Sequence, residues 1–329
     1  MLFTSVSLVI PTYNRGKEIL DTINRILESN LTSINFLEVI VVDDGSTEPI
    51  ESFLSLGEVS QSNISLRCIR QENSGVGAAR NRGFREATGD IILFIDDDIL
   101  VSPELIRQHV EAHREHPNSV ICGFAPFVSC DTPSLTRFAD KITNYVFSED
   151  LRKEFVKGEI VISGQLSIER QMFGQQDYFY RDDLTTPAAE EIELSYRLYQ
   201  QKISILHAKH IVAIHNHHLT YSWLCSQQYK YGIGLGEVYT KYPQIIEFSR
   251  VAGVLTRFGQ PQVKDAPVVY LKKTVKNILI LKRMRTLLLN AINRLEKIAP
   301  NSTKIMSLYE LGTSTHYWAG LKQGLRQFK

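Results

Sequence analysis

The chain has few cysteines, almost no net charge and no long hydrophobic run. Its four cysteines are scattered among 329 residues without a Cys-x-x-Cys pair, which argues against a zinc site or a disulfide framework. Lys and Arg (37) balance Asp and Glu (36), so the formal net charge of +1 gives no indication of a nucleic-acid partner. No apolar run approaches the roughly 20 residues of a membrane span, and the N-terminal stretch lacks the basic start of a signal peptide. We therefore expect a soluble, cytoplasmic globular protein that binds no nucleic acid.

Apolar runs and helical patterns alternate through the first hundred residues. The apolar runs, predicted to be β-strands, are "VSLVIPTY" (6–13), "FLEVIVVDDGS" (36–46), "ISLRCIRQ" (64–71) and "DIILFIDDD" (90–98). Helices are predicted at 16–29, where isoleucine and leucine recur at helical spacing, and at 76–88. Continuous apolar strands separated by helices are typical of a mostly parallel sheet that is covered on both faces. In such sheets ligands bind beyond the carboxyl ends of the strands.

Acidic residues follow two of these strands, at the ends where a ligand is expected. Asp43 and Asp44 end the second strand, and the run of Asp96, Asp97 and Asp98 ends the fourth. Three like charges at the edge of a core repel one another, so they form either a solvated turn or a site for a divalent cation. Asp96 and Asp98 share one face of an extended strand, which suits coordination of Mg²⁺ or Mn²⁺. Because both acidic clusters are expected at one sheet edge, the cation site is the favoured interpretation.

A glycine-rich loop with arginines precedes the second helix. The segment "NSGVGAARNRG" (73–83) fails the Gly-x-Gly-x-x-Gly pattern, because Arg80 stands where the third glycine would be. It is better described as a loop that exposes its backbone and leads into a helix with Arg80 and Arg82 near its start. Guanidinium groups there could meet phosphate oxygens, and the alternative is a helix with solvated arginines.

Two further clusters carry groups that titrate or bind metals. The segment "EEIELSYR" (190–197) predicts a helix with Glu190 or Glu191 in its first turn, where a carboxylate is stabilised and can accept a proton. An ordinary acidic helix start is the alternative. His215 and His217 follow a strand-like run and share one face of it. They could complete an oxygen-rich metal site or contact a diphosphate, or they could be structural or solvated histidines.

The order of these motifs resembles that of family 2 glycosyltransferases. The matching segments are "SLVIPTYNRG", "VIVVDDGST", "NSGVGAARNRGFREATGDIILFIDDD" and "AAEEIELSYRL". Members of this family are inverting, nucleotide-sugar-dependent enzymes of the GT-A fold, a Rossmann-like α/β fold with a mixed, mostly parallel sheet flanked by helices. The resemblance implies a catalytic domain over residues 1–222, with a nucleotide-binding half (1–100) and an acceptor half (101–222). Residues 223–329 would form a helical C-terminal region.

The resemblance also implies roles for residues at matching positions. The nucleotide would be bound by Pro11, Thr12, Tyr13, Asn14, Asp43, Asp44, Gly75, Arg80, Asp96 and Asp97. A Mg²⁺ or Mn²⁺ ion would be held by Asp96, Asp98, His215 and His217. Glu191 would be the catalytic base, and Gly164, Gln165 and Glu190 would lie near the donor sugar and the acceptor. The chain departs from the family pattern at Glu191, where Asp is usual, and at Gln165, where Asn is frequent.

The implied reaction is a single displacement at the anomeric carbon, with inversion of configuration. The donor is expected to be a nucleotide-diphosphate sugar, with UDP the favoured nucleotide, and the acceptor is expected to be a saccharide or a lipid-linked acceptor. In this family a Gln-x-x-Arg-Trp motif after the base accompanies processive polymer synthesis, and no such motif follows Glu191. We therefore expect a non-processive enzyme. The resemblance further implies a hexosyltransferase-like enzyme of polysaccharide or glycoconjugate biosynthesis. Two alternatives stay open: a non-catalytic nucleotide-sugar or carbohydrate-binding protein on the same fold, and a nucleotidyltransferase.

The C-terminal hundred residues have a helical pattern, with interruptions expected at "GIGLGE" (232–237) and in a Gly/Pro stretch (253–267). Residues 269–298 hold eight Lys or Arg and one Glu among leucines and isoleucines. A basic amphipathic helix of this kind can lie on an anionic membrane surface, which would place the protein at the inner face of a membrane. The alternative is a pair of helices that pack on the catalytic domain or on the second subunit of a homodimer.

Overall fold

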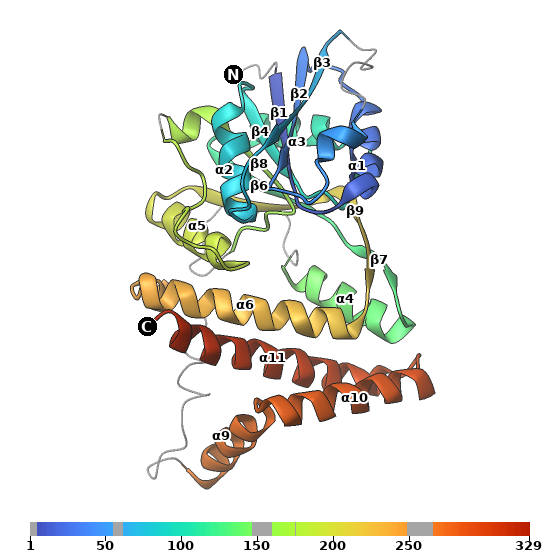
Figure 1. Cartoon of the computed structure of the whole chain (residues 1–329), viewed down its shortest axis with the longest axis vertical. Coiled ribbons are helices and arrows are strands. Elements are labelled where there is room, and N and C mark those ends of the chain that lie inside the picture. Colours follow the sequence, from blue (N-terminus) through green and yellow to red (C-terminus); the bar gives the residue numbers. More distant parts are fainter. Residues whose placement is uncertain (1–4, 55–61, 147–159, 175, 249–265) are drawn as a thin grey trace. The chain divides into compact units, whose positions relative to one another are not determined.

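The computed structural model describes the whole chain except residues 1–4, 55–61, 147–159, 175 and 249–265 (Figure 1). The described residues form two compact units. The first comprises Met1–Val128, Thr143–Thr185 and Glu193–His217, and the second Ser129–Ile142, Thr186–Ile192 and His218–Lys329. The domain boundary expected at residue 222 stays a prediction.

The first unit is built on a mixed β-sheet, which confirms the predicted fold class. Its strands are β1 (Ser5–Thr12), β2 (Phe36–Asp43), β3 (Ile64–Arg70), β4 (Ile91–Ile95), β5 (Ile99–Val101), β6 (Ser119–Phe124), β7 (Phe127–Cys130), β8 (Gln165–Glu169) and β9 (Ser204–Leu219). They are ordered β3-β2-β1-β4-β8-β6-β9-β5, and β7 also pairs with β9. The pairs β1–β2, β1–β4, β2–β3 and β6–β9 are parallel, whereas β4–β8, β6–β8 and β5–β9 are antiparallel.

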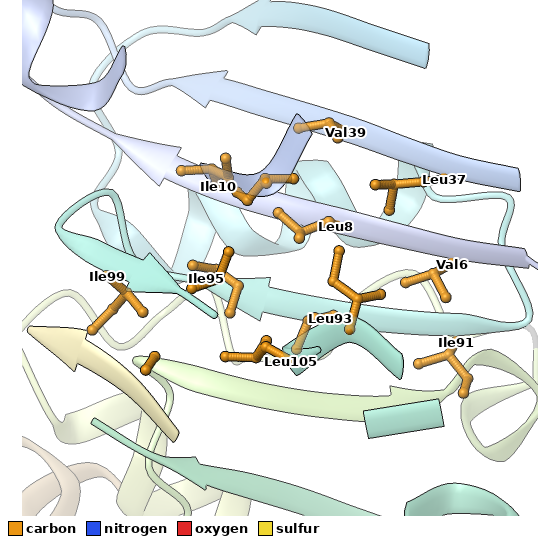
Figure 2. Close-up of a cluster of buried hydrophobic side chains, with 14 of the residues drawn as sticks. Val6, Leu8, Ile10, Leu37, Val39, Ile91, Leu93, Ile95, Ile99 and Leu105 are labelled. Atoms are coloured by element: carbon orange, nitrogen blue, oxygen red, sulfur yellow. The ribbon is translucent and has the colours of Figure 1, made fainter. Parts of the chain in front are cut away.

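Helices cover both faces of this sheet, as the alternating sequence pattern predicts. They are η1 (Gly16–Glu18), α1 (Ile19–Leu27), η2 (Ile50–Phe53), α2 (Val76–Glu86), α3 (Leu105–Glu115), η3 (Arg170–Phe173) and most of α5 (Ala189–Gln200). Successive residues of a strand point to opposite faces. Leu8 and Ile10 therefore join a core with Ile23 of α1, whereas Val9 joins a second core with Phe84 of α2. Figure 2 shows the first of these cores, to which β1, β2 and β4 contribute alternate residues.

The strand register brings the candidate site residues to one edge. Thr12 at the end of β1 pairs with Asp43 at the end of β2, which in turn pairs with Arg70 of β3. On the other side, Val9 of β1 pairs with Phe94, so β4 ends beside them. The carboxyl ends of β1, β2 and β4 thus meet at the edge where a doubly wound sheet binds its ligands.

The second unit is helical. Its elements are α4 (Pro133–Val146), α6 (Tyr221–Lys241), α7 (Ile245–Phe248), α9 (Pro267–Leu279), α10 (Lys282–Ile298), η4 (Thr303–Ile305) and α11 (Met306–Gln327). Within the described part of the chain, none of the helices is both long and apolar enough to cross a membrane. The Gly/Pro stretch expected at 253–267 lies almost entirely outside the described residues.

The interruption expected at "GIGLGE" is wrong, because α6 continues through all three glycines. A Cβ atom on Gly232 would lie 2.0 Å from the carbonyl oxygen of Tyr317 in α11, and one on Gly320 would lie 2.0 Å from that of Tyr229 in α6. The glycines are therefore required by the close approach of two helix backbones, and the tertiary contact outweighs their low helix propensity.

Candidate active site

The loop after β1 is fastened to the loop after β2. The backbone N–H of Asn14 donates to Ser46 Oγ (2.8 Å), and Asn14 Oδ1 accepts from the N–H of Thr47 (2.8 Å). Asn14 has a φ of 55°, a left-handed conformation that asparagine tolerates better than most residues. Next to it, the ring of Tyr13 is 51% exposed. The predicted nucleotide-binding residues after β1 therefore form a held loop that presents an aromatic face.

Asp43 is buried and holds the loop that follows β2. Its Oδ1 accepts from the N–H of Ser46 (2.8 Å), and its Oδ2 accepts from the N–H of Ile50 (3.2 Å) and from Arg70 Nη1 (2.9 Å). Burial by itself would raise the pKa of this carboxyl, but the hydrogen bonds and the Arg70 charge outweigh it and hold the pKa below its ordinary value. Asp43 thus shapes the loop, and its contact with nucleotide stays a prediction.

Asp44 organises the glycine-rich loop. Its Oδ1 accepts from Gln71 Nε2 (2.8 Å) and from the N–H of Ser74 (2.9 Å), and its Oδ2 accepts from the N–H of Gly75 (2.8 Å). Gly75 has a φ of 93° and a ψ of 162°, a conformation that is essentially restricted to glycine. The structure therefore brings the predicted residues Asp44 and Gly75 into direct contact, immediately before α2.

Arg80 reaches from α2 to the first of the three aspartates. Its side chain is 4% exposed, and Nη2 donates to Asp96 Oδ1 at 2.6 Å. The guanidinium also lies over the ring of Tyr180, 5.5 Å from its centroid. The N–H of Asp96 donates to the carbonyl oxygen of Gly164 (3.0 Å), and a Cβ on Gly164 would lie 3.3 Å from Asp96 Oδ2. Three predicted site residues, Arg80, Asp96 and Gly164, are thus neighbours.

Arg15, which is not among the predicted site residues, holds the other two aspartates. Its Nε donates to Asp97 Oδ1 (3.0 Å) and its Nη2 to Asp98 Oδ2 (2.7 Å). Burial raises the pKa of Asp97 to about 6, with the Arg15 charge acting in the opposite direction. Burial acts to lower the pKa of Arg15, but the two carboxylates outweigh it and raise the pKa. The sequence did offer one signal for Arg15, because it directly follows the predicted nucleotide-binding segment "PTYN" (11–14).

His215 lies beside this acidic run. Its Nδ1 lies 3.4 Å from Asp98 Oδ1, and its ring stacks on Phe127 with centroids 4.3 Å apart. The N–H of Asn216 donates to the carbonyl oxygen of Asp98 (2.7 Å), which fixes β9 beside the acidic run. His217 follows two residues further along the same strand and is half-buried.

The donor set fits a hard divalent cation through two side chains. Among the described residues, no group of three or more His, Cys, Asp or Glu side chains is arranged to hold a metal ion. Asp98 Oδ1 and His215 Nδ1, however, are 3.4 Å apart, close to the roughly 3 Å between neighbouring ligands of an octahedral ion bonded at about 2.1 Å. Mg²⁺ usually keeps several waters and takes only one or two carboxylates from the protein. A metal could therefore bond Asp98 Oδ1 and His215 Nδ1, while Arg15 pairs with Asp97 and with the other oxygen of Asp98, and Arg80 pairs with Asp96.

Gln165 lies in the interior, at the end of a chain of buried polar side chains that was not predicted. It is 1% exposed, and its Nε2 lies 3.1 Å from His109 Nε2 of α3. Ser167 Oγ lies 2.8 Å from both His109 Nδ1 and His113 Nε2, and His113 Nδ1 lies 3.8 Å from Glu169 Oε1. Burial lowers the pKa of His109 to about 3 and also lowers that of His113. The contact of Gln165 with donor sugar or acceptor stays a prediction.

The two glutamates expected near the acceptor lie in the first turn of α5, as predicted. Glu190 is buried and Glu191 is half-buried. Both belong to the second compact unit, whereas the aspartates and arginines belong to the first. The roles of Glu190 and Glu191 stay predictions.

A mixed sheet of this order, covered by helices, places the protein in the α/β class. A comparison of sequences gives its family. The family model described as "Glycosyl transferase family 2" matches residues 7–175. That is slightly more than half of the chain, so the chain belongs to this family.

Curated relatives match about a third of the chain. The chain is 36% identical to the uncharacterized glycosyltransferase YfnE of Bacillus subtilis over 119 aligned residues. The alignment covers 36% of this chain and 29% of that protein. The chain is also 36% identical to a dolichol-phosphate mannosyltransferase of Pyrococcus furiosus over 108 aligned residues. That alignment covers 32% of this chain and 29% of the relative. These matches therefore span less than a third of the length of either relative.

Solved structures confirm the GT-A fold, and their alignments cover nearly the whole chain. The mannosyltransferase PcManGT from Pyrobaculum calidifontis, solved with GDP-Man and Mn²⁺, has a TM-score of 0.56 at 15% identity, with 95% of this chain and 87% of that chain covered. Residues 1–349 of S. aureus TarS, solved with UDP, have a TM-score of 0.50 at 16% identity, with 99% and 92% covered. Identities this low show the fold alone.

Proposed function

We propose that this protein is an inverting, non-processive glycosyltransferase that moves a sugar from a nucleotide-diphosphate sugar to an acceptor hydroxyl. The observation that carries the proposal is the convergence of three aspartates, two arginines and a histidine at the carboxyl edge of the sheet, within a family 2 domain. UDP is the favoured nucleotide, and the acceptor is a saccharide or a lipid-linked glycan of polysaccharide or glycoconjugate assembly. The relatives YfnE and dolichol-phosphate mannosyltransferase, which are named as transferases, support this class of reaction.

The nucleotide is bound at the loops that follow β1 and β2. Tyr13 offers an exposed ring on which a base can stack. The loop that contains Gly75 is held open by Asp44, so its backbone can approach a ribose or a phosphate without a side chain in the way.

The leaving diphosphate is stabilised by cations that already stand at this edge. Arg80 and Arg15 carry fixed positive charge beside the acidic run, and preorganised charge of this kind stabilises a group that becomes negative in the transition state. Mg²⁺ or Mn²⁺ would be held by Asp98 and His215, and Asp96 and His217 stay candidate ligands that the resemblance implies. When bound, the ion would neutralise diphosphate charge as a Lewis acid.

The acceptor proton is taken by Glu191. The acceptor oxygen forms a bond to the anomeric carbon as the bond from that carbon to the diphosphate oxygen breaks. The bonding pair leaves with the diphosphate, the proton moves to the Glu191 carboxylate, and the configuration at the anomeric carbon inverts. A carboxylate in the first turn of a helix is stabilised in the ionised form that a base requires.

Calorimetric titration tests the donor site. UDP, GDP and TDP are titrated into the wild type, Asp98→Asn and the control Asp21→Asn, an exposed position of α1, each with Mn²⁺ and with chelator. We expect Mn²⁺-dependent UDP binding in the wild type and the control, weakened more than about tenfold in Asp98→Asn. Absence of binding by every nucleotide under both conditions would overturn the donor site.

Release of UDP from UDP-sugars separates an enzyme from a binding protein. Glu191→Gln is expected to bind UDP as the wild type does while its turnover falls about 100-fold or more. Glu28→Gln, an exposed position at the end of α1, is the matched control. A wild type that binds UDP but consumes no sugar nucleotide, with or without saccharide acceptors, would support the non-catalytic alternative.

A further inference from the structure

The helix α9 exposes an apolar face. Val268, Leu271, Val275 and Ile278 are all exposed, with 63% of Val268 and of Leu271 open to solvent. At about 100° per residue, these four positions fall within an arc of roughly 80°. The described part of the second unit therefore leaves an apolar stripe along α9 uncovered, where a helix on a globular core would bury it.

The helix α10, which follows α9 in the chain (Figure 1), exposes a second apolar arc with cations along one side of it. Leu287 and Ile298 are 61% and 79% exposed, and with the exposed Leu295 they span an arc of roughly 80°. Leu287 forms one edge of this arc. The exposed Arg283 and Arg294 lie just beyond that edge, within about 40° of Leu287. Side chains of α10 thus present a basic strip that adjoins an apolar strip.

The single acidic residue of residues 269–298 is turned away from this surface. Glu296 is 5% exposed, and its Oε1 accepts from Thr132 Oγ1 (3.0 Å) and from the hydroxyl of Tyr309 (2.7 Å). The exposed charges of α10 are consequently all positive, and Lys282 and Lys297 add to those of Arg283 and Arg294.

We infer that the exposed faces of α9 and α10 bind the surface of an anionic lipid bilayer. Apolar side chains enter the headgroup boundary of a bilayer, and adjacent Lys and Arg pair with anionic headgroups. A second copy of the chain fits less well, because two such faces would bring like charges together. This inference goes beyond sugar transfer and is tested without any sugar nucleotide, so the two proposals can fail independently.

Flotation of the full chain with lipid vesicles tests the inference. Phosphatidylcholine vesicles are compared with vesicles that contain about 30% phosphatidylglycerol. We expect binding to the anionic vesicles alone, and weaker binding as salt is raised. The double variant Arg283→Gln, Arg294→Gln should lower the partition coefficient about 25-fold, at about fivefold per cation. The control is Arg25→Gln, Lys202→Gln, two exposed cations of the first unit, which should leave it unchanged.

A second pair of variants tests the apolar contribution. Leu271→Ser with Leu287→Ser changes only exposed positions, so folding should be preserved, as an unchanged urea midpoint would verify, while vesicle binding falls more than about tenfold. Equal binding to both vesicle types, or an equal loss in the control pair, would overturn the inference. Light scattering that finds a dimer abolished by the serine pair, without lipid, would assign the face to a second copy and also overturn it.

Discussion

Replacing His109 by asparagine should change how the stability of the protein depends on pH. His109 is fully buried beside Ser167 and Gln165, and burial, with smaller contributions from His113 and His210, lowers its pKa from 6.5 to about 3. The folded protein therefore keeps this imidazole neutral, whereas the unfolded chain protonates it below about pH 6.5. Because the unfolded state then binds more protons, acid favours unfolding.

The magnitude follows from the two pKa values. Each pH unit below 6.5 and above the folded pKa removes about 1.4 kcal/mol of stability. Near pH 4.5 the loss from His109 alone is about 3 kcal/mol, a substantial part of the about 5–15 kcal/mol that stabilises a typical domain. The contribution is fully present above pH 6.5 and is lost as the pH falls toward 3, which is the sign expected for a histidine whose pKa is depressed.

Urea unfolding at several pH values between about 7 and 4.5 measures this effect. The amide of His109→Asn can keep the contact with Ser167 but does not titrate, so the variant should be less stable than the wild type at pH 7. The difference in unfolding free energy between wild type and variant should become about 3 kcal/mol smaller near pH 4.5. His116→Asn, at the C-terminal end of the same helix and half-buried, is the control for loss of an imidazole. A gap between wild type and His109→Asn that stays constant across this pH range would refute the reasoning.

Three further substitutions test packing and charge at named positions. Gly123→Ala would bring a Cβ to 1.9 Å from Gln165 Nε2 and should cost about 1–3 kcal/mol by urea unfolding. Gly320→Ala would drive a Cβ to 2.0 Å from a backbone carbonyl of α6, which cannot rotate away, so a loss at least as large and a lower melting temperature are expected. Arg15→Gln removes the cation from two adjacent carboxylates and should cost about 1–3 kcal/mol. Mn²⁺ should raise the melting temperature of this variant more than that of the wild type, and equal shifts would contradict the idea that arginine and metal neutralise the same acidic residues.

The sheet and its ligand edge could be predicted because the sequence carries their signals locally. Parallel strands that are covered on both faces give continuous apolar runs, and the runs here end in acidic residues. The positions of Asp43 and Asp96 at the ends of β2 and β4 follow from that pattern once the strands are taken as neighbours. The helical C-terminal region was equally visible in its spacing of leucines and lysines.

Contacts that depend on the direction of a long side chain were not predictable in the same way. Arg15 stands beside residues that the motif singled out, yet no local rule sends its guanidinium to Asp97 and Asp98 rather than into solvent. His109 and His113 did carry a signal, since they lie four residues apart among the apolar positions of α3. Their partners on β8 could be known only from the packing of that strand against the helix.

The charges at the ligand edge explain why a divalent cation is expected to control donor binding. Asp96, Asp97 and Asp98 bring three negative charges, and Arg15 and Arg80 bring two positive ones, so these five groups sum to minus one when all are ionised. A diphosphate adds further negative charge, and the arginines can reach it only by loosening their hold on the carboxylates. A divalent cation at Asp98 and His215 would reverse the sign of the local charge and leave both arginines in place. Nucleotide binding that is equally strong with chelator would therefore mean that the arginines move to the phosphates, and the distances from Arg15 to Asp97 and Asp98 would lengthen in the complex.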